Sequence, residues 1–307
     1  MYILLDRKEI EQLQSCHLCP RECGADRLNG EIGYCGMTSV LRAGLAYLHM
    51  WEEPVISGER GSGTVFFSGC NMKCRYCQNA DISFNGAGKD ISDDRLSVIF
   101  MELQEKGAHN INLVTPTHYV PQIAGALRAA KAAGLHIPVV YNSSAYENVS
   151  TLRMLDGLVD VFLPDLKYYD TELSAELSDA PDYFVNAAKA IAEMVKQQPE
   201  VIPDEDGIML KGVIVRHLVL PGYSDDSKRI LEHLAASYGN NVWLSLMDQY
   251  TPLRPISKMA EMSRRVSYDE YDDLVGYALS LGLDKGFIQE GGAAEDSFIP
   301  LFNGEGI

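Results

Sequence analysis

The chain has 307 residues, of which 46% are apolar, and this is the length and composition of a soluble globular protein with one large domain and an appendage, or with two ordinary domains. Its formal net charge of −17 disfavours a nucleic-acid partner, because binding to phosphates requires clustered Lys and Arg. No apolar run approaches the ~20 residues of a membrane-spanning helix, and the first residues lack a signal-peptide layout, so we expect a cytoplasmic protein without a membrane partner.

Near the N-terminus, four cysteines lie close together: Cys16, Cys19, Cys23 and Cys35. Glycine follows the third and the fourth of them, and glycine permits the tight turns in which backbone amides approach a sulfur. Four thiolates at this spacing predict a closed metal site, and both zinc and a second iron-sulfur cluster fit it. We therefore predict a cysteine-rich metal-binding segment with its linker over residues 1–60, the linker itself running from about 43 to 63.

Three further cysteines, Cys70, Cys74 and Cys77, follow an apolar run at 64–67. One loop with this C-x3-C-x2-C spacing can present three thiolates to three corners of an iron-sulfur cube, which leaves the fourth iron without a cysteine. A cluster held by four thiolates only carries electrons, whereas an open iron can bind a small molecule. A structural zinc site would need a fourth ligand, and no Cys or His follows closely. The odd total of seven cysteines disfavours a disulfide framework.

Downstream of the linker, short β-rich runs alternate with helical periodicities. The strand candidates are 64–67, 111–114, 137–141, 159–163, 213–219, 242–246 and 286–289. Apolar stripes between them predict amphipathic helices, for example Leu96, Ile99, Phe100 and Leu103. This alternation predicts a parallel α/β architecture, and periodicity alone does not distinguish an open doubly wound sheet from a barrel.

Polar residues follow several of the predicted strands. Asp165 and Lys167 are two residues apart, so in an extended chain they face the same side and either form an ion pair or bind a polar ligand together. Arg216 carries a guanidinium group, which suits a carboxylate. The other candidates at strand ends for contact with a cofactor are Thr115, Thr117, Asn142, Ser143 and Gln249. Capping of the following helix is the alternative account for the serine.

The cysteine spacing, with the aromatic Tyr76 before the last cysteine, resembles the signature of the radical S-adenosylmethionine superfamily. The resemblance implies a partial (β/α)6 barrel with a C-terminal extension over residues 61–307, with its active site at the carboxyl ends of the strands. It also implies a 4Fe-4S cluster and S-adenosylmethionine as cofactors, with Tyr76 near the cofactor. The family cleaves S-adenosylmethionine reductively to methionine and a 5′-deoxyadenosyl radical, which abstracts a hydrogen atom from the substrate.

The Asp165-x-Lys167 pair, the segment 215–222 and the N-terminal C-x2-C-P-R-x-C-G pattern resemble the pyruvate formate-lyase activating enzyme branch. This resemblance implies that Lys167 contacts S-adenosylmethionine, that Asp165 lies in the active site, and that Arg216 helps to hold the methionine carboxylate. At 114–119 the sequence departs from the Gly-Gly-Glu segment of that branch.

The branch implies a glycyl radical enzyme as the protein substrate, and a flavodoxin- or ferredoxin-type reductant. One alternative keeps the radical chemistry and changes the substrate to a small metabolite, a peptide or another protein side chain. Another, from a different class, is a noncatalytic iron-sulfur or zinc electron-transfer module.

Overall fold

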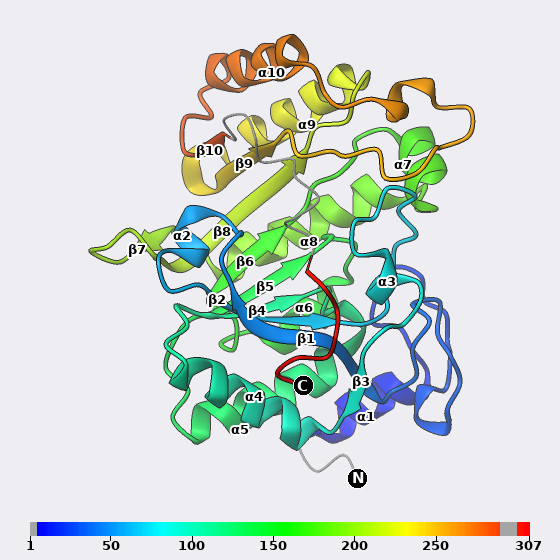
Figure 1. The fold of residues 1–307 in the computed structure, drawn as a ribbon, viewed down its shortest axis with the longest axis vertical. Coiled ribbons are helices and arrows are strands. Elements are labelled where there is room, and N and C mark those ends of the chain that lie inside the picture. Colours follow the sequence, from blue (N-terminus) through cyan, green and yellow to red (C-terminus); the bar gives the residue numbers. More distant parts are fainter. Residues whose placement is uncertain (1–4, 289–299) are drawn as a thin grey trace.

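The computed structural model describes residues 5–288 and 300–307. At its centre is one sheet whose strands follow the order β10-β9-β8-β6-β5-β4-β2-β1-β3, with β7 (Ile202–Pro203) paired to β8. The strands β3 and β10 stand at opposite edges and do not pair with each other in the described part of the chain. The sheet therefore curves without closing, which confirms the predicted partial barrel (Figure 1).

Parallel pairing joins all seven strands that the sequence predicted. They are β2 (Ser62–Phe67), β4 (Ile111–Val114), β5 (Val139–Ser143), β6 (Val161–Pro164), β8 (Met209–Leu218), β9 (Trp243–Met247) and β10 (Gly286–Ile288). Every residue of β2, β4, β5 and β6 is buried, as expected for parallel strands that are covered on both faces. Gln289, the last residue of the final predicted strand, lies outside the described residues.

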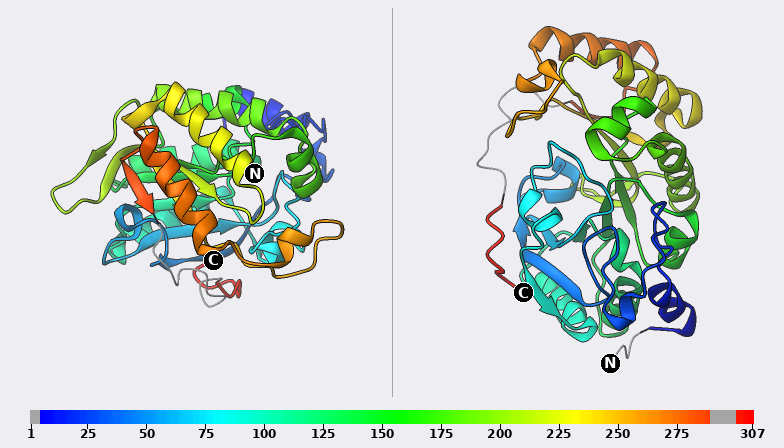
Figure 2. Two further views of the ribbon diagram at one scale, coloured as in Figure 1. Left: turned by 90° about the horizontal axis from the view of Figure 1, so that it is seen from above. Right: turned by 90° about the vertical axis from the view of Figure 1, so that its right-hand side faces the viewer.

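Helices cover the outer face of the sheet, as Figure 2 shows from the side. The long ones are α4 (Asp93–Glu105), α5 (Val120–Ala132), α8 (Tyr183–Gln197), α9 (Ser224–Ser237) and α10 (Tyr268–Ser280), and the shorter ones include α1 (Arg7–Gln14), α2 (Pro54–Ser57), α3 (Ala80–Ser83), α6 (Val149–Leu152) and α7 (Thr171–Ser178). The predicted stripe of α4 is buried. None of the helices in the described part of the chain is long and apolar enough to cross a membrane.

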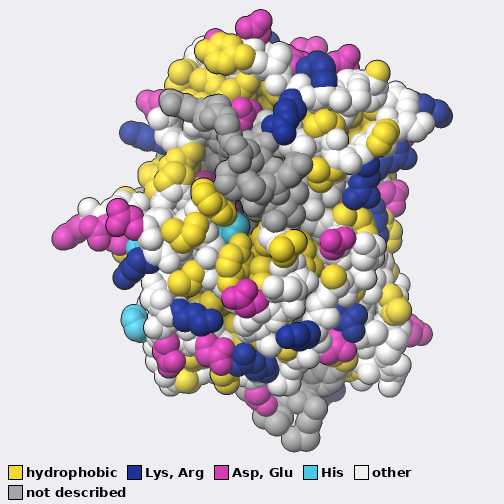
Figure 3. Space-filling view, viewed as in Figure 1, with side chains coloured by type: hydrophobic (Ala, Val, Ile, Leu, Met, Phe, Trp, Pro, Cys, Tyr) yellow, Lys and Arg dark blue, Asp and Glu magenta, His cyan; other side chains and the backbone are white. Residues whose placement is uncertain are grey.

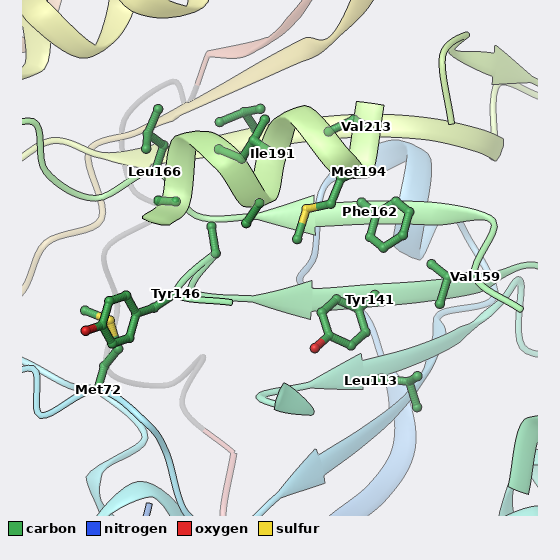
Figure 4. Close-up of a cluster of buried hydrophobic side chains, with 14 of the residues drawn as sticks. Met72, Leu113, Tyr141, Tyr146, Val159, Phe162, Leu166, Ile191, Met194 and Val213 are labelled. Atoms are coloured by element: carbon green, nitrogen blue, oxygen red, sulfur yellow. The ribbon is translucent and has the colours of Figure 1, made fainter. Parts of the chain in front are cut away.

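The main core lies between the helices and the outward side of the sheet. Figure 4 shows Ile191 and Met194 of α8 beside Phe162 of β6 and Val213 of β8. All four side chains are fully buried. Burial of apolar area on this scale is the main favourable term that holds the parallel strands in register.

A further strand, β1 (Leu41–His49), lies in the segment that the sequence analysis assigned to a linker, and the prediction is wrong over these residues. The strand pairs antiparallel with β2, from Ala43 opposite Phe67 to His49 opposite Ser62, and with β3 (Lys89–Ile91). Gly44 and the alanines weaken the sequence signal for a strand, and burial of both faces removes the alternation that marks one. The division into residues 1–60 and 61–307 stays a prediction, although β1 adds a strand of the first part to the sheet of the second.

The direction of β1 decides where the following residues go. Because β1 runs antiparallel to β2, residues 50–61 begin at the amino end of β2, whereas the cysteine loop follows its carboxyl end. Figure 1 accordingly shows α2 and α3 at opposite ends of the strands. The C-terminal residues run beside β1, where Gly304 donates its amide to Gly44 O at 2.9 Å and Glu305 O accepts from Ala46 N at 2.9 Å.

Candidate active site

A cavity of about 700 Å³ lies on the inner side of the sheet. Its lining includes Cys74 and Cys77 from the cysteine loop, Asn142, Asp165, Lys167 and Arg216 from the parallel strands and their ends, and Glu52 and Glu53 from the segment after β1. Figure 3 shows that apolar side chains gather across the middle of the face that Figure 1 presents. The lining therefore combines residues that follow the carboxyl ends of the parallel strands with residues from the segment after β1.

The cysteine loop is held against the N-terminal cysteine-rich segment. Cys70 N donates to Cys35 O at 3.2 Å, so a backbone hydrogen bond connects the cysteine loop to the N-terminal cysteines. Gly69, just before the loop, has φ +85°, and a Cβ there would lie 2.4 Å from Met37 Cγ and 2.9 Å from Cys35 O. Only glycine fits this turn, because its neighbours are too close for any side chain.

A chain of hydroxyl groups supports the sulfur of Cys74. Ser178 Oγ donates to Cys74 Sγ at 3.0 Å, and the hydroxyl of Tyr168 lies 2.7 Å from Ser178 Oγ and 2.6 Å from that of Tyr76. Burial raises the pKa of the Cys74 thiol, and the charge of Lys167 opposes this rise. Tyr168 and Ser178 were missed by the sequence analysis, because nothing in their local pattern marks them as neighbours of Cys74, which is 104 residues before Ser178.

Asp165 is the centre of a buried ion network. Its carboxylate accepts from Lys167 Nζ at 2.7 Å and from Arg216 Nε at 2.8 Å. The structure therefore shows Asp165 and Lys167 as an ion pair, which was one of the two interpretations of their spacing. Burial by itself would raise the pKa of Asp165, but the Arg216 and Lys167 charges hold it below its usual value.

Arg216 has a different acceptor for each of its three nitrogens. Besides Asp165, it donates to Glu52 Oε2 at 3.1 Å and to Asn142 Oδ1 at 2.6 Å. Glu52 also accepts from Asn112 Nδ2 and Asn142 Nδ2, each at 3.2 Å. Sequence reasoning missed Glu52 because it stands in the segment taken for a linker. The role of Arg216 toward a methionine carboxylate stays a prediction, since protein groups already occupy its guanidinium.

The remaining predicted site residues divide into two groups. Tyr76, Asn142 and Gln249 line the cavity together with the ion network. Among the described residues, the lining does not include Thr115, Thr117 or Ser143. Thr117 Oγ1 instead donates to the buried Glu147 at 2.6 Å, and Ser143 Oγ accepts from Ala145 N at 3.2 Å. The hydroxyls of Thr117 and Ser143 thus stabilise the local fold. Contact with a cofactor stays a prediction for Thr115, Thr117 and Ser143.

A buried guanidinium group lies beside three of the N-terminal cysteines, Cys16, Cys23 and Cys35. Arg27 is fully buried, lies 3.9 Å from Cys16 Sγ, and donates to the carbonyls of His118 at 2.5 Å and Thr38 at 2.7 Å. No carboxylate pairs with Arg27 within the described ranges, although a buried charge requires a countercharge. Cysteine thiolates would supply it, as they do when they bind a metal.

A model of the radical SAM superfamily matches residues 64–234, which is more than half of the chain and includes the cysteine loop, Asp165, Lys167 and Arg216. The chain belongs to the radical SAM superfamily. The predicted resemblance to this superfamily is thereby confirmed. Membership implies that the enzyme uses a 4Fe-4S cluster and S-adenosylmethionine.

Two known proteins are related to this radical SAM enzyme in sequence. It is 31% identical over 293 residues to an uncharacterized protein of Methanocaldococcus jannaschii, a match that spans 92% of this chain and 80% of that protein. It is 22% identical over 179 residues to the pyruvate formate-lyase-activating enzyme of Staphylococcus epidermidis, which spans 55% of this chain and 65% of that enzyme.

Solved structures of radical SAM enzymes resemble it more distantly. Streptococcus suis SuiB bound to its precursor peptide SuiA has a TM-score of 0.47 at 16% identity, and the match covers 69% of this chain and 43% of SuiB. Methylornithine synthase (PylB) has a TM-score of 0.41 at 16% identity, with 71% of this chain and 67% of that enzyme covered. The chain thus spans less than half the length of SuiB.

The donor set of the cysteine loop fits a 4Fe-4S cluster. Its three cysteines stand in one loop after β2, and two of them, Cys74 and Cys77, line the cavity. A cube binds each thiolate to a different iron and does not need the sulfurs to converge on one point, whereas zinc does. Cys70, Cys74 and Cys77 would hold the cluster of this radical SAM enzyme. For Cys16, Cys19, Cys23 and Cys35 the choice between zinc and a second cluster stays open.

We expect Gly69→Ala to lower the iron content of the reconstituted enzyme and to destabilise it by more than the ~1–2 kcal/mol of left-handed strain alone. The new methyl group would push Met37 and the Cys35 carbonyl away from the cysteine loop. Gly107→Ala is the matched control, because Gly107 has nearly the same φ, +87°, with open space around its Cβ position. Iron analysis and thermal unfolding would measure both effects, and equal losses in the two variants would contradict the account.

We expect Arg27→Met to reduce the metal bound by the N-terminal cysteines, because their thiolates would lose the buried cation that faces them. Iron and zinc per chain would be counted after anaerobic purification, with Cys19→Ala as the variant that removes a predicted ligand outright. The exposed Arg254→Met is the control for loss of a positive charge elsewhere. Wild-type enzyme without any metal beyond one 4Fe-4S cluster would contradict a metal site here.

Proposed function

We propose that this radical SAM enzyme is an activase that takes a hydrogen atom from a glycine of a partner glycyl radical enzyme. The observation that carries the proposal is one cavity lined both by the cysteine loop and by the Asp165, Lys167 and Arg216 network. The distant relationship with the pyruvate formate-lyase-activating enzyme supports the choice of partner.

The reaction consumes one electron and one S-adenosylmethionine for each glycyl radical. When bound, the reduced cluster supplies the electron that breaks the bond between sulfur and C5′, which yields methionine and a 5′-deoxyadenosyl radical. A flavodoxin- or ferredoxin-type protein is the proposed source of this electron. The radical takes one hydrogen atom from glycine and becomes 5′-deoxyadenosine, so the unpaired electron remains on the partner.

The residues of the chain hold and shield the reactants. Lys167, fixed by its 2.7 Å ion pair with Asp165, presents a positive charge beside Cys74, where it favours anionic groups. The centre of the Tyr76 ring lies 5.9 Å from that of the Tyr250 ring, and both side chains form part of the cavity wall. Such aromatic walls exclude water, which protects a reactive radical from side reactions.

Anaerobic incubation with S-adenosylmethionine, reductant and the glycyl radical enzymes of the same host tests the proposal. Electron paramagnetic resonance should show the doublet of a glycyl radical with one of them, and a sample without S-adenosylmethionine is the control. Absence of the doublet with every such enzyme, from a preparation that cleaves S-adenosylmethionine, would end the activase proposal.

A second candidate keeps the radical and replaces the partner with a small metabolite or a peptide. The observation that favours it is the size of the cavity, about 700 Å³, whose lining extends from the cysteine loop to Glu52 and Glu53 of the segment after β1. A rise in 5′-deoxyadenosine release with an extracted metabolite pool, and none with glycyl radical enzymes, would decide for it.

A further inference from the structure

Two adjacent carboxylates reach the cavity from the end of the barrel opposite to the cysteine loop. Glu52 and Glu53 follow β1, whose last residue, His49, pairs with the first residue of β2. The cysteine loop follows the last residue of β2, so the two sets of side chains approach the cavity from opposite directions.

The carboxylates of Glu52 and Glu53 differ in their hydrogen-bond partners. Glu52 accepts hydrogen bonds from Arg216 and from two asparagine amides. Glu53 is only 8% exposed, and its Oε2 has no hydrogen-bond partner. Burial raises the pKa of Glu53, and the charge of Arg216 and the hydroxyl of Ser245 oppose this rise, but neither of them donates a hydrogen bond to Oε2.

Among the described residues of the cavity lining, no cation is shown donating a hydrogen bond to Glu53, although the charge of Arg216 acts on it. Lys167 is bonded to Asp165, and the three nitrogens of Arg216 are bonded to Asp165, Glu52 and Asn142. The charged residues of the lining are three carboxylates, Glu52, Glu53 and Asp165, and two cations, so one negative charge is in excess. A buried carboxylate with a free oxygen is unfavourable unless a ligand supplies the missing donor.

We propose that Glu53 binds a protonated amine of the substrate, so that the substrate class is a molecule or peptide side chain that carries a primary ammonium group. The inference rests on the second candidate function, in which the radical acts on a small metabolite or a peptide held in this cavity. An ammonium group supplies the hydrogen-bond donor that Glu53 Oε2 lacks, and its charge balances the third carboxylate of the lining.

S-adenosylmethionine also carries an ammonium group, so the two sources must be separated. A cofactor held at the cysteine loop sits at the carboxyl end of β2, and Glu53 enters from the amino end. On the basis of this direction of entry we assign Glu53 to the substrate, so its loss should leave binding of S-adenosylmethionine unchanged.

The test uses the reconstituted holoenzyme with S-adenosylmethionine under anaerobic conditions, and follows its melting temperature. The probes are ethylamine, putrescine and N-acetyl-L-lysinamide, with N-acetyl-L-norleucinamide as the neutral analogue of the last. At least one amine should raise the melting temperature while the neutral analogue does not. In Glu53→Gln, which keeps the shape and loses the charge, the affinity for that amine should fall about tenfold or more.

Glu59→Gln is the matched control, because Glu59 is an exposed residue of the same segment. No shift with any amine, an equal shift with the neutral analogue, or a shift that persists in Glu53→Gln would overturn the inference. A loss of affinity for S-adenosylmethionine in Glu53→Gln would assign Glu53 to the cofactor and overturn it as well.

Release of 5′-deoxyadenosine after dithionite reduction, measured in the same samples, keeps the two proposals apart. Wild-type enzyme that cleaves S-adenosylmethionine and binds no amine would refute the inference alone. Amine binding that depends on Glu53, in a cluster-loaded enzyme that never cleaves S-adenosylmethionine, would support the amine site and refute the radical function.

Discussion

Cys74→Ala should abolish the release of 5′-deoxyadenosine from S-adenosylmethionine by the reconstituted, dithionite-reduced enzyme, a fall of at least about 100-fold. Cys74 is the cysteine of the loop whose sulfur is oriented by Ser178 and faces the charge of Lys167. Its loss leaves two thiolates for a cube that needs three, so both the cluster and its open iron are lost. Chromatography of the product and iron analysis of the same sample measure the effect.

Arg75→Ala is the control for this prediction. Arg75 stands between the cysteines in sequence, but its side chain forms an exposed ion pair with Glu176 at 2.6 Å. Exposed pairs contribute little, so this variant should keep its cluster and its activity. Cleavage that survives in Cys74→Ala at the wild-type rate would refute the assignment of the loop.

Arg216→Met should lower the free energy of unfolding by roughly 3–5 kcal/mol, because it removes the cation between two buried carboxylates. Asp165 and Glu52 accept from Arg216 at 2.8 and 3.1 Å, and only Asp165 keeps a second cation, Lys167. Urea unfolding followed by circular dichroism, at constant reductant, would measure the change. We also expect weaker binding of S-adenosylmethionine, since the carboxylates and Lys167 would rearrange in the cavity.

Two further variants test whether the charge or the geometry of Arg216 matters. Arg216→Lys keeps the charge but cannot reach three acceptors at once, so it should recover only part of the stability. The double variant Asp165→Asn/Arg216→Met should cost less than the sum of its parts, because the two groups interact directly. Additive losses, or an Arg216→Met protein as stable as the wild type, would show that these carboxylates are not ionised in the folded enzyme.

The strands and the cysteine loop were predictable because their signals are local. The predicted run at 111–114 coincides with β4, since a short apolar stretch with β-branched residues specifies a buried parallel strand. The spacing of Cys70, Cys74 and Cys77 is likewise contained in eight consecutive residues. Asp165 and Lys167, two residues apart, were correctly expected to share one face.

The sequence did not predict β1 or the positions of the two threonines after β4, because these depend on the tertiary structure. β1 has buried residues on both faces and a glycine within it, so its pattern has no period that the sequence reveals. Thr115 and Thr117 stand at a strand end and yet lie outside the cavity lining among the residues described, because the chain turns there through a residue with φ +58°. A position after a strand does not determine where a side chain points.

By itself, the sequence determined the superfamily, the parallel strands and the three cysteines, all of which depend on spacings within one segment. Only the tertiary structure decided that Glu52 and Glu53 reach the cavity, that Arg216 bridges Asp165 and Glu52, and that Cys35 touches Cys70. Contacts between distant segments depend on the direction of β1 and on the curvature of the sheet, and these follow from packing the whole chain around one core rather than from any local pattern.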